Sequence, residues 1–418
     1  MVRKILVFGD WGDLKGITQI GELTTEMIRG KEVFSFEYAE EWLRSPNSQR
    51  LDPDLQLYGG PQYLKDNKPN FGLFLNSSPD RWGRVLMKRR EAILARKEAR
   101  KPSTLYETDF LLGVYDGNRM GGLRFKEAED GPFLGHENEL AALPWVSLRE
   151  LEHASLRLEN DNTKEAEELK WLNLLMAPGS SLGGARPKAN VTDTHGNLWI
   201  AKFPSLNDAR DIGAWEMVVY ELANISGLNV TPAKLLKFSG RHHTFLTNRF
   251  DRIGQTRRIH FASAMTLLGH TDGTDHHDGV SYLDLAGFIQ QNGSNVNWNL
   301  KELWSRIVFN ILVKNTDDHL QNHGFLLRTE GWELSPAYDM NTIPEGNGLT
   351  LNISENDNSL EVELALQVSS HFRLKPSEAK EIIDRIAKAI SQWQKIANQY
   401  KLSRREQEMM AEALDTKL

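Results

Sequence analysis

The strongest chemical pattern in the sequence is the segment Asn315-Thr316-Asp317-Asp318-His319-Leu320-Gln321-Asn322. Asn322 follows Asp317 at the spacing that kinase catalytic loops use for a base and a metal ligand. Phosphoryl transfer needs a carboxylate that orients the attacking hydroxyl, and oxygen atoms that hold magnesium against the phosphates. The spacing therefore predicts Asp317 as the catalytic carboxylate and Asn322 as a magnesium ligand.

A second metal-binding carboxylate is expected soon after this loop. Apolar residues 324–327 and 332–334 flank a turn at Glu330-Gly331, which predicts a hairpin that ends at Asp339. An Asp-to-Asn spacing alone also fits a simple capped loop, but a buried helix before it and the hairpin behind it favour a magnesium site. Within the loop, His319 is expected to order the backbone by hydrogen bonding, and Asp318 is expected to be a solvated neighbour.

A glycine-rich segment, 179–188, provides a candidate phosphate loop. Adjacent Gly183 and Gly184 let backbone N–H groups approach phosphate oxygens, and Arg186 and Lys188 add positive charge. The segment lacks the Gly-Lys-Ser/Thr ending of a Walker A loop. Taken alone, it fits a plain hairpin turn equally well.

Lys202 ends the apolar run 198–201 and is the candidate lysine for ATP phosphates. A lysine in an apolar strand is costly to bury unless an anion pairs with it. Phosphates would supply that anion, and so would Glu216 on the next helix. The alternative is a strand-end lysine whose ammonium reaches water.

Two other polar segments have less specific patterns. The predicted helix 80–101 carries nine Lys or Arg residues, which favours a solvated face over a surface for nucleic acid or an acidic partner. Residues 270–279 contain His270, His276 and His277 among aspartates and glycines, as a metal cluster might, but the composition favours a polar loop, with a hinge or partner contact as the alternative.

Periodicity indicates the elements that position these residues. Apolar residues from 300 to 312 recur at helical spacing and predict a buried helix that leads into Asn315. A hairpin is predicted over 189–203 and a helix over 211–226. Near the end of the chain, Ser377 is expected to cap one helix, and Ser403 with Glu406 to form the capping box of another.

Composition sets broad limits on function. The chain has 418 residues, 40% hydrophobic, with 50 Lys and Arg against 57 Asp and Glu. The net charge of −7 argues against wholesale coating of nucleic acid. Cysteine is absent, which excludes thiolate metal sites and thiol nucleophiles. No leader or stretch of about 20 apolar residues is apparent, so a cytoplasmic protein without a membrane partner is expected.

With these patterns in place, the sequence resembles the HipA-like serine/threonine kinases, the toxin halves of toxin–antitoxin pairs. The segments that carry the resemblance span nearly the whole chain: 71–74, 78–84, 109–113, 117–125, Ser181–Lys188, Asn248–Arg252, Asn315–Gly324 and Leu334–Asp339. The resemblance implies an α+β, bilobal kinase fold. Its expected parts are a β-rich amino-terminal domain over 1–148, a nucleotide-binding part over 149–262, and an all-helical lobe over 263–418.

The resemblance also implies roles for particular residues. Asp317 would be the base, Asn322 and Asp339 magnesium ligands, and Lys202 the ATP lysine, with Glu216 rather than Glu221 as its partner. Ser181 would be a phosphate-loop serine that the kinase autophosphorylates, with Ser180 as its neighbour. Unlike many kinases, the loop has no His-Arg-Asp, and Met340-Asn341 follow Asp339.

Partners are implied in the same way. The family pattern suggests a helix-turn-helix antitoxin of the HipB type, operator DNA reached through that antitoxin, and a protein substrate such as an aminoacyl-tRNA synthetase. Two alternatives stay open from the sequence: a catalytically silent subunit that acts as a transcriptional co-repressor, and a small-molecule kinase.

Overall fold

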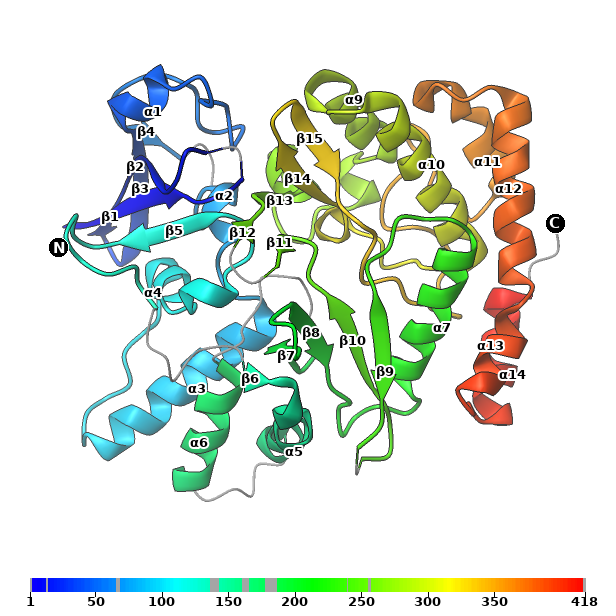
Figure 1. Ribbon diagram of the computed structural model, residues 1–418, viewed down its shortest axis with the longest axis horizontal. Helices are drawn as coiled ribbons and strands as arrows, with labels where there is room; N and C mark the ends of the chain where they lie inside the picture. Colours follow the sequence, from blue (N-terminus) through cyan, green and yellow to red (C-terminus); the bar gives the residue numbers. More distant parts are fainter. Residues whose placement is uncertain are drawn as a thin grey trace. The chain divides into compact units, whose positions relative to one another are not determined.

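The protein divides into two compact units. The first comprises 1–207 and 248–262, and the second 208–247 and 263–418. The computed structural model (Figure 1) describes residues 2–12, 14–64, 68–135, 143–159, 165–176, 186–238, 240–254 and 257–415. The three-part division expected from the sequence stays a prediction.

The first unit begins with an antiparallel sheet in the order β4-β3-β2-β1-β5. Alternating residues explain why these segments form strands: Ile5 and Val7 are buried on one face of β1, and Phe34 and Phe36 do the same on β3. The strands are β1 (Val2–Gly9), β2 (Thr18–Ile28), β3 (Lys31–Tyr38), β4 (Gln62–Tyr63) and β5 (Leu123–Lys126).

A basic helix, α3 (Arg81–Lys97), follows in the same unit. Asp80 caps it by accepting a hydrogen bond from the Gly83 N–H. Several of its cations contact protein groups: Arg84 pairs with Glu107, and Arg89 donates to the Leu158 carbonyl. Further helices of this unit are α1 (Glu40–Arg44), α2 (Gly72–Leu75), α4 (Glu107–Leu112), η1 (Asp116–Asn118), η3 (Trp145–Ser147), α5 (Leu148–Glu159) and α6 (Glu165–Met176).

The predicted hairpin over 189–203 forms in this unit. Strands β7 (Lys188–Thr192) and β8 (Leu198–Lys202) pair antiparallel, and β6 (Leu143–Pro144) pairs parallel with β7. The register places Lys188 directly opposite Lys202. The short strands β11 (Arg252–Ile253) and β12 (Arg257–Arg258) also pair, and β13 (Phe261–Ser263) follows them.

The second unit is built around helix α10 (Val296–Leu312), the buried helix that the sequence predicts. Leu303, Trp304 and Ile307 are fully buried. The helix packs against α9 (Tyr282–Asn292), α11 (Val362–Gln367) and α12 (Pro376–Ile390), which surround it in Figure 1. This packing fixes the carboxyl end of α10, from which the predicted catalytic loop starts.

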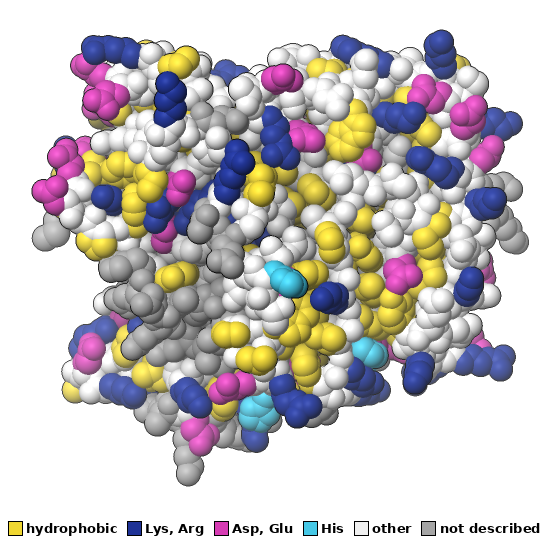
Figure 2. All heavy atoms as spheres, viewed as in Figure 1, with side chains coloured by type: hydrophobic (Ala, Val, Ile, Leu, Met, Phe, Trp, Pro, Cys, Tyr) yellow, Lys and Arg dark blue, Asp and Glu magenta, His cyan; other side chains and the backbone are white. Residues whose placement is uncertain are grey.

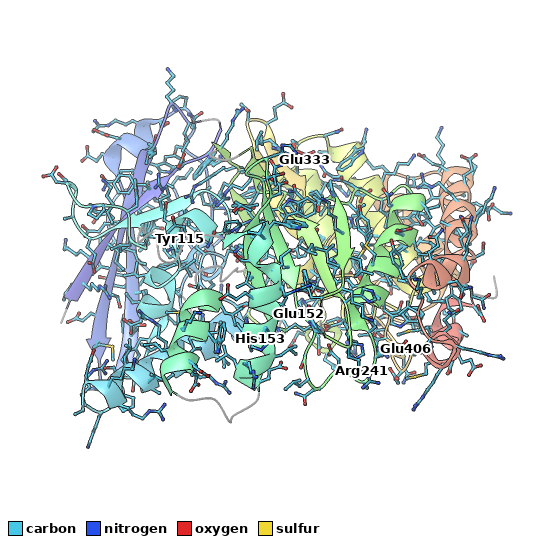
Figure 3. All side chains as sticks on the ribbon, turned by 60° about the horizontal axis from the view of Figure 1, so that its bottom comes forward. Tyr115, Glu152, His153, Arg241, Glu333 and Glu406 are labelled. Carbon is cyan, nitrogen blue, oxygen red and sulfur yellow. The ribbon has the colours of Figure 1, made fainter. Side chains whose placement is uncertain are left out.

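Helix α7 (Ile212–Ile225) confirms the helix expected over 211–226, and Asp211 caps it. Glu406 (labelled in Figure 3) accepts a hydrogen bond from the Asp211 N–H, so α14 (Arg404–Leu414) is tied to the start of α7. The remaining elements of this unit are β9 (Ala233–Leu236), β10 (Thr244–Asn248), α8 (Ala264–Leu267), η4 (His276–Asp278), η5 (Leu320–Asn322), η6 (Ser369–Phe372) and α13 (Trp393–Gln399).

Residues 263–418 are mainly, but not wholly, helical, which corrects the expectation of an all-helical lobe. Strands β14 (Gly324–Arg328) and β15 (Gly331–Leu334) form the antiparallel hairpin predicted from their apolar residues. Gly331 makes the turn with φ of 130°, a conformation open to glycine.

Of the two helix caps predicted near the end of the chain, one is confirmed and the other is wrong. Ser403 and Glu406 form the expected capping box of α14. Ser377 is not a cap, because Lys375 occupies the N-cap position of α12 and Pro376 begins the helix. Proline is favoured at that position, since its missing N–H would have no partner in the first turn anyway.

Surface features of the described residues are ordinary. No helix among the described ranges has both the length and the apolarity to cross a membrane. In Figure 2, Lys and Arg side chains on the right-hand part are interspersed with Asp and Glu rather than gathered into one basic surface.

Candidate active site

The predicted catalytic loop leaves the end of α10 through a sharp backbone turn. Lys314 adopts φ of 51°, the left-handed region that non-glycine residues rarely occupy, and its N–H donates to the Ile311 carbonyl. This turn exposes the Asp317 side chain at the loop surface, while Asn315 and Asp318 on either side of it are buried. The loop therefore presents one carboxylate to solvent and anchors itself with its neighbours.

Asn322 has the geometry expected of a metal ligand. It is buried on η5, and its Nδ2 donates a 2.9 Å hydrogen bond to the backbone oxygen of Asp317. That bond fixes the orientation of the amide. Its Oδ1 is also buried, and within the described part of the chain no group donates a hydrogen bond to it. A buried acceptor without a donor is costly, and a cation would satisfy this one.

Asp339 lies on the segment that follows β15, as the sequence predicts. Its φ of 57° is again in the left-handed region, where aspartate is tolerated better than most side chains. The preceding residue joins this segment to the catalytic loop, because the Tyr338 hydroxyl donates a 2.6 Å hydrogen bond to the Gln321 carbonyl. The backbone thus holds Asp339 next to the loop that carries Asp317 and Asn322.

The electrostatics of Asp317 reflect this arrangement. Partial burial raises the pKa of Asp317 above the usual aspartate range, and the Asp339 and Asp318 carboxylates raise it further, while His319 opposes them. A carboxylate whose proton affinity is raised by neighbouring carboxylates lies where a bound cation would relieve the repulsion. Oxygen donors of this kind suit magnesium.

Asp318 contradicts the expectation of a solvated neighbour. The residue is only 4% exposed, and one of its oxygens, Oδ2, accepts hydrogen bonds from Tyr282 (2.6 Å) and Asn310 (2.7 Å). The same oxygen lies 2.7 Å from Nε2 of His323. Burial alone would raise the pKa of Asp318, but the charge and hydrogen bond of His323 and the hydrogen bond from Tyr282 outweigh it and hold the pKa below the usual range.

A chain of amide side chains extends this anchor. Asn315 donates to Oδ1 of Asn310 at 3.0 Å, and its own Oδ1 accepts the Asn341 N–H at 3.1 Å. The catalytic loop and the segment after Asp339 are therefore both attached to helix α10. Sequence reasoning missed these supports, although a polar Asn310 within an apolar helix face was a usable signal.

His319 orders the loop through its backbone. Its N–H donates to the Asp317 carbonyl, and its carbonyl accepts the Asn322 N–H at 2.8 Å. The side-chain role expected for His319 is filled by His323, which is buried against Asp318.

Most of the predicted phosphate loop, 179–188, lies outside the described residues. Ser180, Ser181, Gly183 and Gly184 lie outside the described residues. Arg186 is described, and its Nη2 donates to the Phe203 carbonyl at 3.1 Å.

Lys188 has a protein partner. Its ammonium lies 2.7 Å from Oδ2 of Asp80, and both side chains are almost fully buried. Burial raises the pKa of Asp80, and the charge of Lys188 opposes that rise. Lys188 therefore directs its charge to a carboxylate of its own unit. Lys202, opposite it on the neighbouring strand β8, stays the predicted phosphate lysine.

Lys202 ends β8 in the first unit, and Glu216 is buried on α7 in the second. Their pairing stays a prediction. The alternative partner, Glu221, accepts a hydrogen bond from the Tyr400 hydroxyl.

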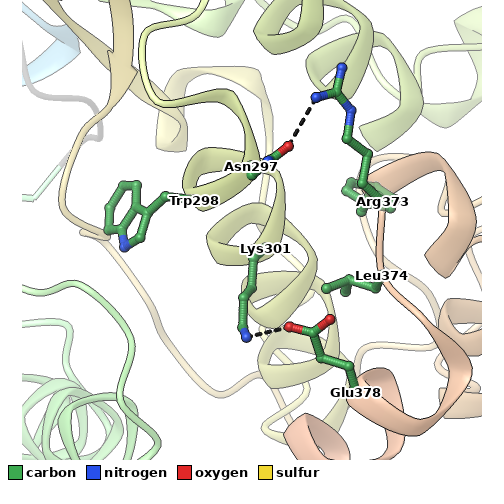
Figure 4. A pocket seen from close by; sticks show the side chains of 7 residues that line it. Asn297, Trp298, Lys301, Arg373, Leu374 and Glu378 are labelled. Atoms are coloured by element: carbon green, nitrogen blue, oxygen red, sulfur yellow. Dashed lines mark hydrogen bonds and ion pairs between the residues drawn. The ribbon is translucent and has the colours of Figure 1, made fainter.

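A hollow of about 560 Å³ lies elsewhere in the second unit (Figure 4). Its charged groups are engaged with each other: Lys301 pairs with Glu378 at 2.5 Å, and Arg373 donates to Asn297 at 2.9 Å. Its described lining includes none of the predicted site residues, so its size does not make it the candidate active site.

The chain is similar to known proteins over much of its length. The HipA-like C-terminal domain matches residues 180–394, about half of the chain. A putative kinase of Haemophilus influenzae is 28% identical over 184 residues, which cover 40% of this chain and 53% of that protein. A serine/threonine-protein kinase toxin HipA of Shewanella oneidensis is 25% identical over 259 residues, 56% of this chain and 58% of that protein.

The chain thus spans between half and three fifths of the length of these two relatives. Among solved structures, the complex of Shewanella oneidensis HipA with HipB and operator DNA contains a chain that matches with a TM-score of 0.63 and 20% identity. That match covers 98% of this chain and 95% of the other, and it shows a shared mixed α/β fold. With half of its length matched by the family domain, the chain belongs to the HipA-like family.

Proposed function

We propose that this protein is an ATP- and magnesium-dependent serine/threonine protein kinase. The observation that carries the proposal is Asn322, whose buried Oδ1 lacks a hydrogen-bond donor among the described residues while its Nδ2 is fixed on the Asp317 backbone. An oriented, unsatisfied oxygen in the same loop as the Asp317 carboxylate is suited to hold a cation. The kinase names of the relatives support the same activity.

The donor set fits magnesium, because Asn322 and Asp339 offer oxygen ligands and Asp339 is held beside the loop by the Tyr338–Gln321 bond. When bound, the metal would neutralise negative charge on the phosphates. Asp317, which is exposed, would orient the acceptor hydroxyl and take up its proton. Lys202 and Arg186 would bind phosphate oxygens, with Gly183 and Gly184 offering backbone N–H groups and Glu216 positioning Lys202.

Asp318 would act as a positioning residue in this scheme. It contacts no reacting group, but its bonds to Tyr282, Asn310 and His323 fix the backbone from which Asp317 projects. An ionised Asp318 keeps all three contacts, since each of them directs a polar hydrogen or a positive charge toward its Oδ2.

The biological role follows from the family. We propose that the kinase is the toxin of a toxin–antitoxin pair and phosphorylates a protein such as an aminoacyl-tRNA synthetase. A HipB-like helix-turn-helix antitoxin would hold it and reach operator DNA. The support is the name of the Shewanella relative and its structure in complex with HipB and operator DNA. Autophosphorylation of Ser181, with Ser180 as the neighbouring candidate, would regulate it, because a phosphate adds about two negative charges where ATP must bind.

The test compares three proteins in a labelled-ATP transfer assay: the native chain, Asp317→Asn, and Asp357→Asn as a matched control on an exposed turn. Loss of a group on which the transition state depends costs about a thousandfold in rate. We expect Asp317→Asn to bind Mg-ATP in a thermal-shift assay but to lose transfer, while the control retains both.

The outcomes also separate the alternative functions. A native chain that binds Mg-ATP but transfers no phosphate to itself or to any host protein would favour the silent co-repressor. Transfer only to metabolites in the same assay would favour the small-molecule kinase. Undiminished transfer by Asp317→Asn would contradict the assignment of the catalytic carboxylate.

A further inference from the structure

The polar loop before helix α9 contains a second cluster of possible metal ligands, apart from the oxygen donors of the catalytic loop. Asp275, His276 and His277 each offer one ligand atom, and these atoms all lie within 4.8 Å of one another. The sequence pattern favoured an ordinary polar loop here. The structure instead brings the three side chains to one point on the turn η4.

The distances leave room for an ion. Nδ1 of His276 lies 4.0 Å from Oδ1 of Asp275, too far for a hydrogen bond. This nitrogen is buried, and nothing in the described ranges forms a hydrogen bond with it. Two ligands of one tetrahedral zinc ion, each about 2.1 Å from the metal, are about 3.4 Å apart. A small side-chain adjustment would therefore bring both atoms onto one ion.

The two imidazole rings are already close together. Their centroids are 4.0 Å apart with an interplanar angle of 37°. The turn that holds them is well braced: Asp275 accepts the His277 N–H at 2.8 Å, Asp278 accepts the Asp275 N–H at 3.1 Å, and Gly279 closes the turn with φ of 78°. The backbone thus holds the three side chains together before any ligand binds, which lowers the entropic cost of binding.

The backbone of His276 is also fixed from the other side. Its N–H donates to the Thr350 carbonyl at 2.8 Å, and its carbonyl accepts from Nδ2 of Asn352 at 3.0 Å. Thr350 in turn donates through its hydroxyl to the Thr316 carbonyl, at 2.8 Å, in the catalytic loop. The histidine turn and the catalytic loop therefore share one supporting segment, residues 350–352.

We propose that Asp275, His276 and His277 bind a divalent transition-metal ion such as Zn²⁺, with water completing the coordination. Two imidazoles and one carboxylate suit zinc, whereas magnesium prefers oxygen ligands. The site therefore differs in chemistry from the magnesium site proposed at Asn322 and Asp339, and it does not depend on kinase activity. Occupancy would stabilise the segment that supports the catalytic loop.

The test is a Zn²⁺ titration of the untagged full chain by isothermal calorimetry, in the presence of excess Mg²⁺. We expect uptake of one ion and a rise in melting temperature, because binding to the folded state alone stabilises it. His277→Ala is the main variant, because this side chain is exposed and its ring contacts the neighbouring His276 ring rather than the core. It should lower the affinity at least about tenfold, the lower end of what loss of even an outer-shell partner costs.

His195→Ala is the matched control, because His195 is an exposed histidine on the loop between β7 and β8. It should leave the Zn²⁺ affinity unchanged, and circular dichroism should show both variants folded. The proposal is overturned if the native chain takes up no zinc, or if His277→Ala binds it as tightly as the native chain does. Failure of phosphate transfer alone would have no bearing on it.

Discussion

Two regions of the molecule carry buried aspartates among polar partners, and they use them in opposite ways. One is the arginine cluster of the first unit, formed by Arg249, Asp251 and Arg252. The other is the catalytic loop of the second unit, where the buried Asp318 stands next to the exposed Asp317. Both regions belong to segments through which the sequence resembles the HipA-like family, so motif similarity alone does not tell them apart.

The arginine cluster is saturated with hydrogen bonds. Asp251 is fully buried and accepts from Arg249 at 2.8 and 2.6 Å, from Arg252 at 2.5 Å, and from the Gly121 N–H at 2.8 Å. Burial alone would raise the pKa of Asp251, but the charges of Arg249 and Arg252 outweigh it and lower the pKa to about 2. Arg249 also donates to the Asn118 carbonyl. Such a network joins distant segments of one unit.

In the catalytic loop, hydrogen bonds within the described ranges satisfy the buried Asp318 but not every polar atom of the residues predicted to act on ATP. Asp318 has its partners, whereas Asp317 is exposed and Oδ1 of Asn322 is buried with no donor among the described residues. Both oxygens of Asp251 are engaged by donors, whereas the loop offers the exposed Asp317 carboxylate and an Asn322 oxygen without a donor in the described part of the chain. Substitutions should therefore act on stability in one region and on activity in the other.

The largest effect on stability is expected for Asp251→Ala. It leaves two buried guanidinium groups without their carboxylate, and breaking a buried pair in this way costs about 3–5 kcal/mol. Urea denaturation should show the loss in the free energy of unfolding. Asp130→Ala, on an exposed loop of the same unit, should stay within about 0.5 kcal/mol of the native chain. Equal stability of the two variants would mean that the cluster is not structural.

A smaller loss is expected for Asp318→Asn. The amide keeps one acceptor, but it loses the ionised oxygen that Tyr282, Asn310 and His323 share, and an unsatisfied buried group costs about 1–3 kcal/mol. Thermal unfolding measures this loss. Because Asp318 positions the loop, kcat should fall more than KM for ATP rises. A normal kcat in a destabilised variant would restrict Asp318 to a purely structural role.

Asn322→Ala should weaken metal binding strongly and change the stability of the fold only slightly. Only one hydrogen bond is lost, from Nδ2 to the Asp317 backbone, so the free energy of unfolding should change by about 1 kcal/mol or less. The Mg²⁺ concentration needed for half-maximal transfer should rise at least about tenfold, because an oxygen ligand is missing. An unchanged Mg²⁺ requirement would remove Asn322 from the metal site.

The smallest effect concerns Asp317→Asn without metal. Burial and the neighbouring carboxylates raise the pKa of Asp317, so its charge destabilises the folded state above that pKa. The neutral amide should therefore make the metal-free protein slightly more stable near neutral pH, by less than about 1 kcal/mol because the group is exposed. The difference should vanish as the pH falls through the raised pKa. A less stable variant at neutral pH would contradict this electrostatic picture.

The sequence predicted those features that depend on residues close together in the chain, and it missed those that depend on distant residues. Asp317, Asn322 and Asp339 were predictable because a short loop and a hairpin place them, and both have strong apolar patterns. Asp318 was misjudged because its burial depends on Tyr282, which is distant in sequence. The arginine cluster also depends on contacts between segments distant in sequence, because Arg249 donates to a carbonyl more than a hundred residues away. The histidine turn was dismissed on composition, and only its backbone conformation brings the ligands together.

The most direct test of the central claim is a crystal structure with magnesium and a non-hydrolysable ATP analogue. The account predicts Oδ1 of Asn322 and a carboxylate oxygen of Asp339 about 2.0–2.1 Å from the metal. It also predicts the Lys202 ammonium on the phosphates and Asp317 facing the terminal phosphate. A nucleotide bound with Lys202 directed away from it, or with the metal held by other residues, would contradict the account.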